Sequence, residues 1–111
     1  MQMLLATIML GGSGATMPPP AAEIARGVID ARQAGDVRQA ADLQLQFALF
    51  PARWMHRGLT PTMKAAMRFI GINVGEPYPP YAGLDEDEVR ALEALLKTTL
   101  LARHGAVNAQ R

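Results

Sequence analysis

The apolar residues of this chain recur with the 3.6-residue period of an amphipathic helix in four separate stretches. The four stretches cover residues 21–33, 36–57, 60–70 and 85–104. Asp36 and Asp85 open the second and fourth stretches, and a Gln or Glu stands three residues after each, which is the pattern of a capping box. We therefore predict four helices. The first two should form an antiparallel pair, because only Ala34-Gly35-Asp36 joins them.

Each of these helices has an expected buried face. In the first helix this face is made by Ile24, Ala25, Val28 and Ile29. In the second it is made by Val37, Ala40, Ala41, Leu45, Ala48 and Leu49, with bulk from Phe47, Trp54 and Met55. In the last it is made by Val89, Leu92, Leu95, Leu96, Thr99 and Leu100. Pro51 lies inside the second helix and cannot donate to the carbonyl of Phe47, so we predict a kink there.

The N-terminal segment is the one stretch with the pattern of a strand. Residues 1–10 are apolar almost throughout. This apolar run is shorter than the roughly 20 residues of a membrane-spanning helix. They lack the basic residues of a secretory signal, although Ser13-Gly14-Ala15 could be a cleavage site. A segment that is apolar on both faces fits a parallel sheet covered on both sides. We predict a buried strand that begins at Leu4 and runs into the turn Gly11-Gly12-Ser13-Gly14.

The third helix is followed by a proline-rich arm. Thr60 before Pro61 has the pattern of an N-cap with proline at the first helical position, and Gly71 is expected to end the helix. The arm, residues 75–81, contains three prolines and cannot continue as a helix or a central strand. It should lie across a surface built by other elements, with Tyr78 and Tyr81 as packing anchors.

Composition narrows the possible functions. A chain of 111 residues makes one domain at most, and its net charge of +1 gives no reason to expect nucleic acid or an anionic membrane as a partner. The absence of cysteine excludes a disulfide, a thiol nucleophile and a thiolate zinc site. The glycine turn is not G-x-G-x-x-G and has no following Lys-Ser/Thr, so we expect no nucleotide cofactor.

Three other features could carry chemistry, and each has a simpler interpretation. His56 and His104 each have an arginine next to them and lie near predicted helix ends, so we expect each to interact favourably with the dipole at a helix C-terminus rather than to bind a metal. The acidic residues 85–88 lack the glycine and the ligand spacing of a calcium loop and are explained by helix capping. Lys64 could form a Schiff base, but helix periodicity would let it extend from an apolar stripe to water, or bond the last carbonyls of a neighbouring helix.

The order of these motifs resembles the dihydrodipicolinate synthase and N-acetylneuraminate lyase family. The likeness spans about Leu4 to Leu96 and is nearer to the N-acetylneuraminate lyase branch. The motifs that carry it are G-G-S-G-A after the strand, Gln44 in A-A-D-L-Q, Gly58-Leu59, Lys64 within its helix, and Gly71-Ile72-Asn73-Val74-Gly75 before the arm Pro77-Tyr78-Pro79-Pro80.

This resemblance implies a C-terminal piece of a (β/α)8 TIM barrel that forms a Schiff base with a 2-oxo acid such as pyruvate. The family's substrate-carboxylate motif, active-site tyrosine and Schiff-base lysine have no counterpart in these residues, and Lys64 does not match that lysine. We therefore expect no catalytic residue here. The end of the strand could bind substrate through Gly14, Ala15 and Thr16. Pro18 stands where the lyases carry a substrate-binding serine.

The resemblance also implies an organisation for the chain. Residues 1–111 would be a single barrel fragment, with the last barrel strand and turn at 4–16, the helix pair at 21–57, a C-terminal helical extension at 58–104 and a tail at 105–111. The expected function is part of a cytoplasmic carbon–carbon lyase that is incomplete in isolation. Its partners would be a 2-oxo acid and a second copy, through exposed helix faces. Two alternatives are a helical interaction module and a small exported helical protein.

Overall fold

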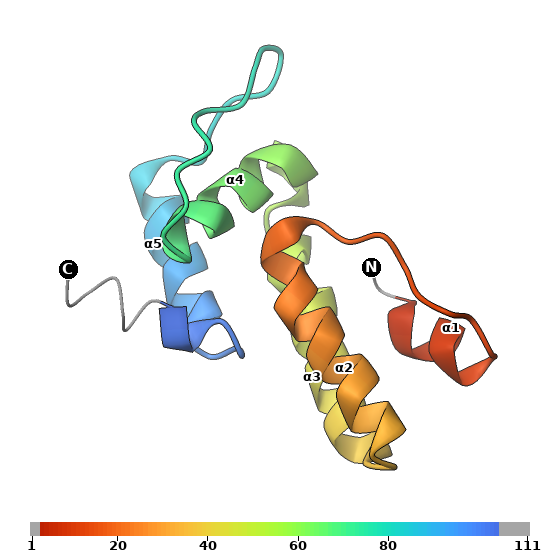
Figure 1. The fold of residues 1–111 in the computed structure, drawn as a ribbon. Coiled ribbons are helices and arrows are strands. Elements are labelled where there is room, and N and C mark those ends of the chain that lie inside the picture. Colours follow the sequence, from red (N-terminus) through yellow and green to blue (C-terminus); the bar gives the residue numbers. More distant parts are fainter. Residues whose placement is uncertain (1–2, 105–111) are drawn as a thin grey trace. The chain divides into compact units, whose positions relative to one another are not determined.

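The computed structural model describes residues 3–104, without the side chains of residues 49–51. The chain divides into two compact units, residues 1–49 and 50–111, and Figure 1 shows the elements of each. Within residues 3–104 every element is helical. No helix in this range is both long enough and apolar enough to cross a bilayer.

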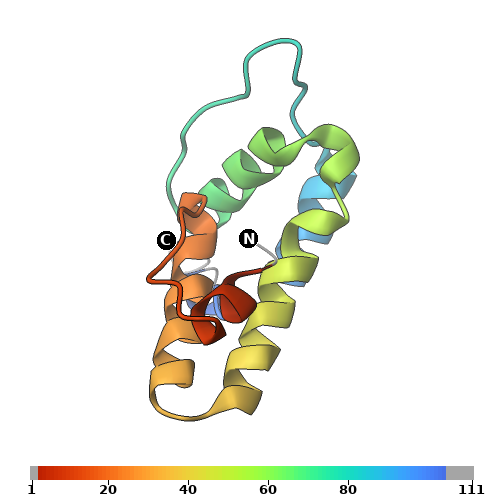
Figure 2. The same cartoon turned by 90° about the vertical axis from the view of Figure 1, so that its right-hand side faces the viewer.

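The first unit contains the predicted helix pair. A short 3-10 turn, η1 (Pro19–Ala21), leads into α2 (Ala22–Gln33), and α3 (Val37–Ala52) returns beside it in both views of the ribbon (Figures 1 and 2). Gly35 ends α2 with φ +82°, and the Asp36 N–H donates to the Ala31 carbonyl at 2.9 Å. The Asp36 carboxylate accepts from the Gln39 N–H at 3.0 Å. The cap that was predicted at Asp36 is confirmed.

The predicted strand is wrong for the described residues. Leu4–Met9 form a helix, α1, in which the Thr7 N–H donates to the Met3 carbonyl at 2.8 Å. Gly11, with φ +95°, ends it. A strand needs a neighbour for its backbone groups, and residues 3–104 include no other strand. A helix satisfies those groups within the segment itself.

A side chain from α3 completes the start of α1. Met3 is the N-cap residue and makes no side-chain cap. Instead the Leu5 N–H donates to Oε1 of Gln44 at 2.8 Å. Only Leu4 is buried in α1, whereas Met9 is exposed although it is apolar. This long-range cap therefore holds a helix that buries little of its own apolar surface.

The buried face of α2 matches the prediction except that Ile29 is only half-buried, whereas the prediction for α3 is correct for Ala40 and Phe47 and wrong for Val37 and Leu45. Ile24, Ala25 and Val28 are buried in α2, as expected. In α3 the buried residues are Ala40, Leu43 and Phe47, whereas Val37 and Leu45 are 45% and 57% exposed. Two neighbouring stripes of α3 are apolar, so periodicity alone could not choose between them. The stripe that contains the larger Phe47 is the one that packs.

In the second unit the helix boundaries differ from those predicted. The α3 helix ends at Ala52 rather than Arg57, and the next residues form a 3-10 turn, η2 (Met55–Arg57). The next helix, α4 (Leu59–Phe69), begins at Gly58, whose φ of +91° and ψ of +160° break the preceding turn. Thr60 is therefore inside the helix and not its N-cap. Gly71, with φ +96°, ends α4 as predicted.

The last helix, α5 (Glu86–Leu96), is shorter than expected. Its capping box is confirmed, because the Glu88 N–H donates to Oδ1 of Asp85 at 2.8 Å and the Asp85 N–H donates to Oε1 of Glu88 at 3.2 Å. At the other end the buried Thr99 hydroxyl donates to the Leu96 carbonyl at 2.7 Å and accepts from the Leu101 N–H. A threonine that bonds its own backbone in this way competes with helix continuation. The end predicted at Gly105 lies outside the described residues.

The core of the second unit draws on each of its helices and on the chain after α5. Its buried side chains are Trp54, Pro61, Thr62, Met63, Ala66, Phe69, Leu92, Leu96, Thr99 and Leu101. The α4 and α5 helices contact each other directly. This packing places the N-terminus of α5 close to η2, since the Arg57 and Glu88 side chains are bonded there.

Candidate functional site

The three residues predicted to bind substrate lie in an extended segment between α1 and η1. Gly14, Ala15 and Thr16 are all exposed. A Cβ atom placed on Gly14 would meet no other atom within 4 Å. The described residues therefore form no enclosed site around this segment. A substrate-binding role for these three residues stays a prediction.

Lys64 forms a hydrogen bond with the segment that leads into the proline arm. Its Nζ donates to the Val74 carbonyl at 3.1 Å, where the chain leaves α4 and enters the arm. One turn further along α4, Nη2 of Arg68 pairs with Oε1 of Glu76 at 2.7 Å. These two contacts fix the start of the arm to α4. The Lys64 amine thus bonds a carbonyl of the segment after its own helix, and not the last carbonyls of a neighbouring helix as one expectation had it.

The most connected polar group of the second unit is the Glu88 carboxylate. Arg57 donates to it through Nη2 at 2.6 Å and through Nε at 3.0 Å, so the ion pair is bidentate. Nε2 of His56 lies 3.2 Å from Oε2 of Glu88. The Asp85 carboxylate is 3.6 Å from Nη2 of Arg57. The side chain of Glu88 is only 16% exposed.

These bonds shift the ionisation of the pair. The Arg57 guanidinium and the Asp85 backbone N–H donate hydrogen bonds that lower the pKa of Glu88 to about 2. The hydrogen bond that Arg57 donates to Glu88, together with the negative charge of Glu88, in turn raises the pKa of Arg57. Both groups therefore stay charged through the neutral range. Glu88 caps α5 and anchors η2 with the same carboxylate.

The structure predicts an acid-sensitive contribution from Glu88. Because its pKa is lowered from 4.5 to about 2, its stabilisation is complete above pH 4.5 and is lost as the pH falls toward 2. Replacing Glu88 by Gln should lower the free energy of unfolding at pH 7, and most of that difference from wild type should disappear by about pH 2. Urea unfolding at a series of pH values measures this.

Glu86→Gln is the matched control, because it removes the same charge from the same turn of α5. A Glu88→Gln deficit that stays constant from pH 7 to about pH 2 would contradict the ion pair.

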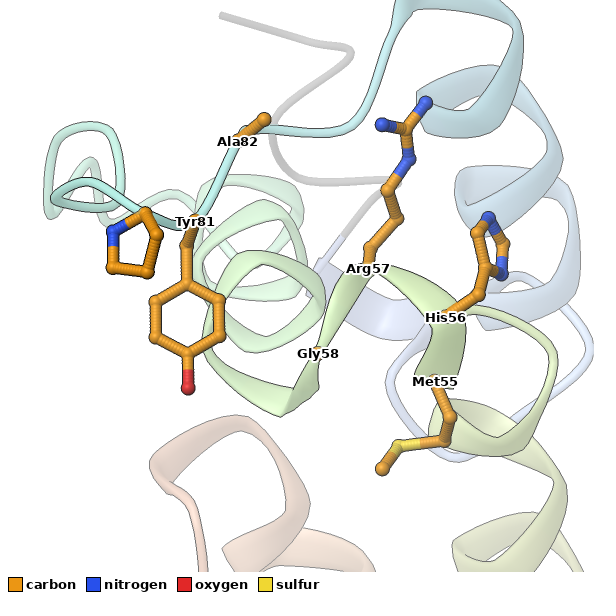
Figure 3. A pocket seen from close by; sticks show the side chains of 7 residues that line it. Met55, His56, Arg57, Gly58, Tyr81 and Ala82 are labelled. Atoms are coloured by element: carbon orange, nitrogen blue, oxygen red, sulfur yellow. The ribbon is translucent and has the colours of Figure 1, made fainter.

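An open pocket of about 420 Å³ lies beside this ion pair. It is lined by Met55, His56, Arg57, Gly58, Pro80, Tyr81 and Ala82. Figure 3 shows that η2 and Gly58 form one side of it and that the end of the arm forms the other. The Tyr81 ring lies against Gly58, where an added Cβ would come within 2.9 Å of Cε1. The pocket therefore offers an aromatic ring, a thioether, an imidazole and a guanidinium.

Sequence reasoning did not find this pocket. Arg57 and Glu88 are 31 residues apart, and nothing in their spacing pairs them. His56 was expected to interact with the dipole at a helix C-terminus, but its Nε2 instead contacts Glu88 at the N-terminus of α5. Tyr78 was expected to pack, but its side chain is 87% exposed. Within residues 3–104 no cluster of three or more His, Asp or Glu side chains is placed to hold a metal ion.

Comparison with known proteins identifies a family. The model of the dihydrodipicolinate synthetase family matches residues 2–99, which is most of the chain. No curated protein and no solved structure matches the chain significantly. The chain therefore belongs to the dihydrodipicolinate synthetase family of aldolases and lyases, and it corresponds to a part of that family's (β/α)8 barrel.

Proposed function

We propose that these residues are the C-terminal part of a carbon–carbon lyase of the N-acetylneuraminate lyase branch, which acts on a 2-oxo acid such as pyruvate. In this chemistry a lysine amine attacks the 2-oxo carbonyl carbon, and water leaves as the C=N bond of the Schiff base forms. The observation that carries the proposal is the family match over residues 2–99. The order of Gly58-Leu59, Lys64 and Gly71–Gly75 before the arm supports the branch.

The lysine of the Schiff base comes, in this proposal, from outside the 111 residues. The sequence has two lysines, Lys64 and Lys97. The Lys64 amine is bonded to the Val74 carbonyl, and Lys97 is an exposed residue at the end of α5. Lys64 lines a pocket of only about 40 Å³, far below the roughly 300–1,000 Å³ of ligand sites. Lys97 lies at the surface, so neither amine has a site that would hold a 2-oxo acid away from water. In this proposal Gly14, Ala15 and Thr16 of this chain contact the substrate, and its helices pack around the barrel. The enzyme acts in the cytoplasm.

Borohydride trapping tests the proposed absence of a catalytic lysine. We expect the purified 111-residue chain, incubated with pyruvate and sodium borohydride, to show no increase in mass. The variants Lys64→Arg and Lys97→Arg serve to locate an adduct should one form. An adduct on wild type that disappears in one of these variants would assign the nucleophile to that lysine and contradict the proposal.

A chimera tests the family branch. Residues 4–104 would replace the corresponding segment of an N-acetylneuraminate lyase, which keeps its own Schiff-base lysine. We expect the folded chimera to be trapped with pyruvate by borohydride, because the segment supplies only the barrel end and covering helices. A chimera with the circular dichroism spectrum of the parent lyase but no adduct would overturn the assignment.

A further inference from the structure

The arm presents an aromatic side chain that its own unit does not use. Tyr78 is 87% exposed, and the flanking apolar residues Ile72 and Val74 are 51% and 43% exposed. In both ribbon views the arm loops out from α4 and α5 (Figures 1 and 2). An exposed tyrosine is a frequent anchor of protein interfaces, since its ring buries a large area while only two side-chain torsions are restricted.

The arm is held in place, which lowers the entropy lost when it binds. Lys64 and Arg68 of α4 bond Val74 and Glu76 at its start. Beyond these contacts the Tyr81 N–H donates to the Tyr78 carbonyl at 3.1 Å, which closes a turn. Tyr78 is therefore presented from a preformed turn between fixed ends, and preorganisation of this kind favours association.

The pocket beside Arg57 has the chemistry that recognises a phenol ring. Its volume of about 420 Å³ is within the range of small-molecule sites, roughly 300–1,000 Å³. The Met55 sulfur and the Tyr81 ring make favourable contacts with aromatic groups. Arg57 bonds Glu88 through Nε and Nη2, in the plane of the guanidinium, so its flat face can stack on a ring. His56 can exchange a hydrogen bond with a hydroxyl group.

We propose that Tyr78 of one copy inserts into the pocket lined by Met55, Arg57 and Tyr81 of a second copy, and that the second copy does the same in return. Tyr78 is not among the residues that line its own pocket. The arm and the pocket belong to the same unit, so each copy carries both halves of the contact. Because each copy makes the same contact with the other, the two copies form a closed dimer with two-fold symmetry. This proposal is independent of the lyase assignment.

Sedimentation equilibrium of the 111-residue chain tests the dimer. We expect wild type to exchange between monomer and dimer, and Tyr78→Ser to raise the dissociation constant about tenfold or more. Leu45→Ser is the matched control, because Leu45 is an exposed apolar residue of α3 and is not part of the contact. A wild type that stays monomeric at high concentration, or a dimer that is lost in Leu45→Ser but kept in Tyr78→Ser, would overturn the proposal.

Cross-linking places the contact. The natural chain has no cysteine, so Tyr78→Cys and Met55→Cys can be made as single-cysteine variants. When the two are mixed, Cys at position 78 of one copy would face Cys at position 55 of the other, while the remaining Tyr78 still fills the opposite pocket. We expect a mixed disulfide to form faster than between Tyr78→Cys and Leu45→Cys. Equal rates for the two mixtures would contradict the contact, and circular dichroism confirms that each variant is folded.

Discussion

Replacing Phe47 by alanine is expected to lower the free energy of unfolding by about 3–5 kcal/mol. The Phe47 side chain is 0% exposed and is the largest fully buried side chain of the first unit. Truncating it removes apolar area from the core and leaves a cavity that the fixed backbones of α2 and α3 fill only in part. Urea unfolding followed by circular dichroism measures the loss.

Leu45→Ala is the matched control, because Leu45 is two residues away on the same helix and is 57% exposed. It should change the free energy of unfolding by no more than about 0.5 kcal/mol. This pair of variants decides which of the two apolar stripes of α3 is the packed one. Equal losses for Phe47→Ala and Leu45→Ala would contradict the orientation of α3 in the structure.

Replacing Gly58 by alanine should cost about 1–3 kcal/mol, because a side chain at φ +91° is strained. The added Cβ would also come within 2.9 Å of Cε1 of Tyr81 and push that ring away. Both effects act on the residue that separates η2 from α4 and forms part of the pocket. Thermal unfolding measures the loss of stability. Sedimentation equilibrium of Gly58→Ala, compared with that of Tyr78→Ser, reports damage to the pocket.

Two further variants separate strain from collision. Gly14→Ala should be nearly neutral, because Gly14 has no positive φ and open space around its Cβ position. In the double variant Gly58→Ala/Tyr81→Ala the collision with the ring is removed, but the backbone strain remains. We expect the double variant to be no more stable than Tyr81→Ala. A double variant that regains the stability of wild type would show that backbone strain at Gly58 is negligible.

The features that were predicted correctly are local ones. The caps at Asp36 and Asp85 depend on a side chain and a backbone N–H only three residues apart. Gly71 ends α4 for a similarly local reason, because glycine accepts the left-handed conformation without a steric penalty. The antiparallel helix pair follows from its short connection. Each of these can be read from a window of a few residues.

The features that were missed depend on partners distant in sequence. Residues 4–9 form a helix, since residues 3–104 include no strand that could pair with them and Gln44 on α3 caps their first turn. The buried stripe of α3 depended on how Phe47 packs. The end of α5 was missed for a local reason instead, because the Thr99 hydroxyl bonds the Leu96 carbonyl only three residues away and competes with the helix. Propensity and periodicity contain none of this information.

The sequence by itself determined the family, the presence of helices within residues 22–33, 37–52, 59–69 and 86–96, and most of the helix caps, because these follow from motif order and short-range backbone chemistry. The tertiary structure alone decided which face of α3 is buried, and it alone paired Arg57 with Glu88 across 31 residues. It also showed that Tyr78 is exposed on the arm rather than packed. The physical reason is that burial and ion pairing depend on distances in space, which the spacing of residues along a chain does not specify.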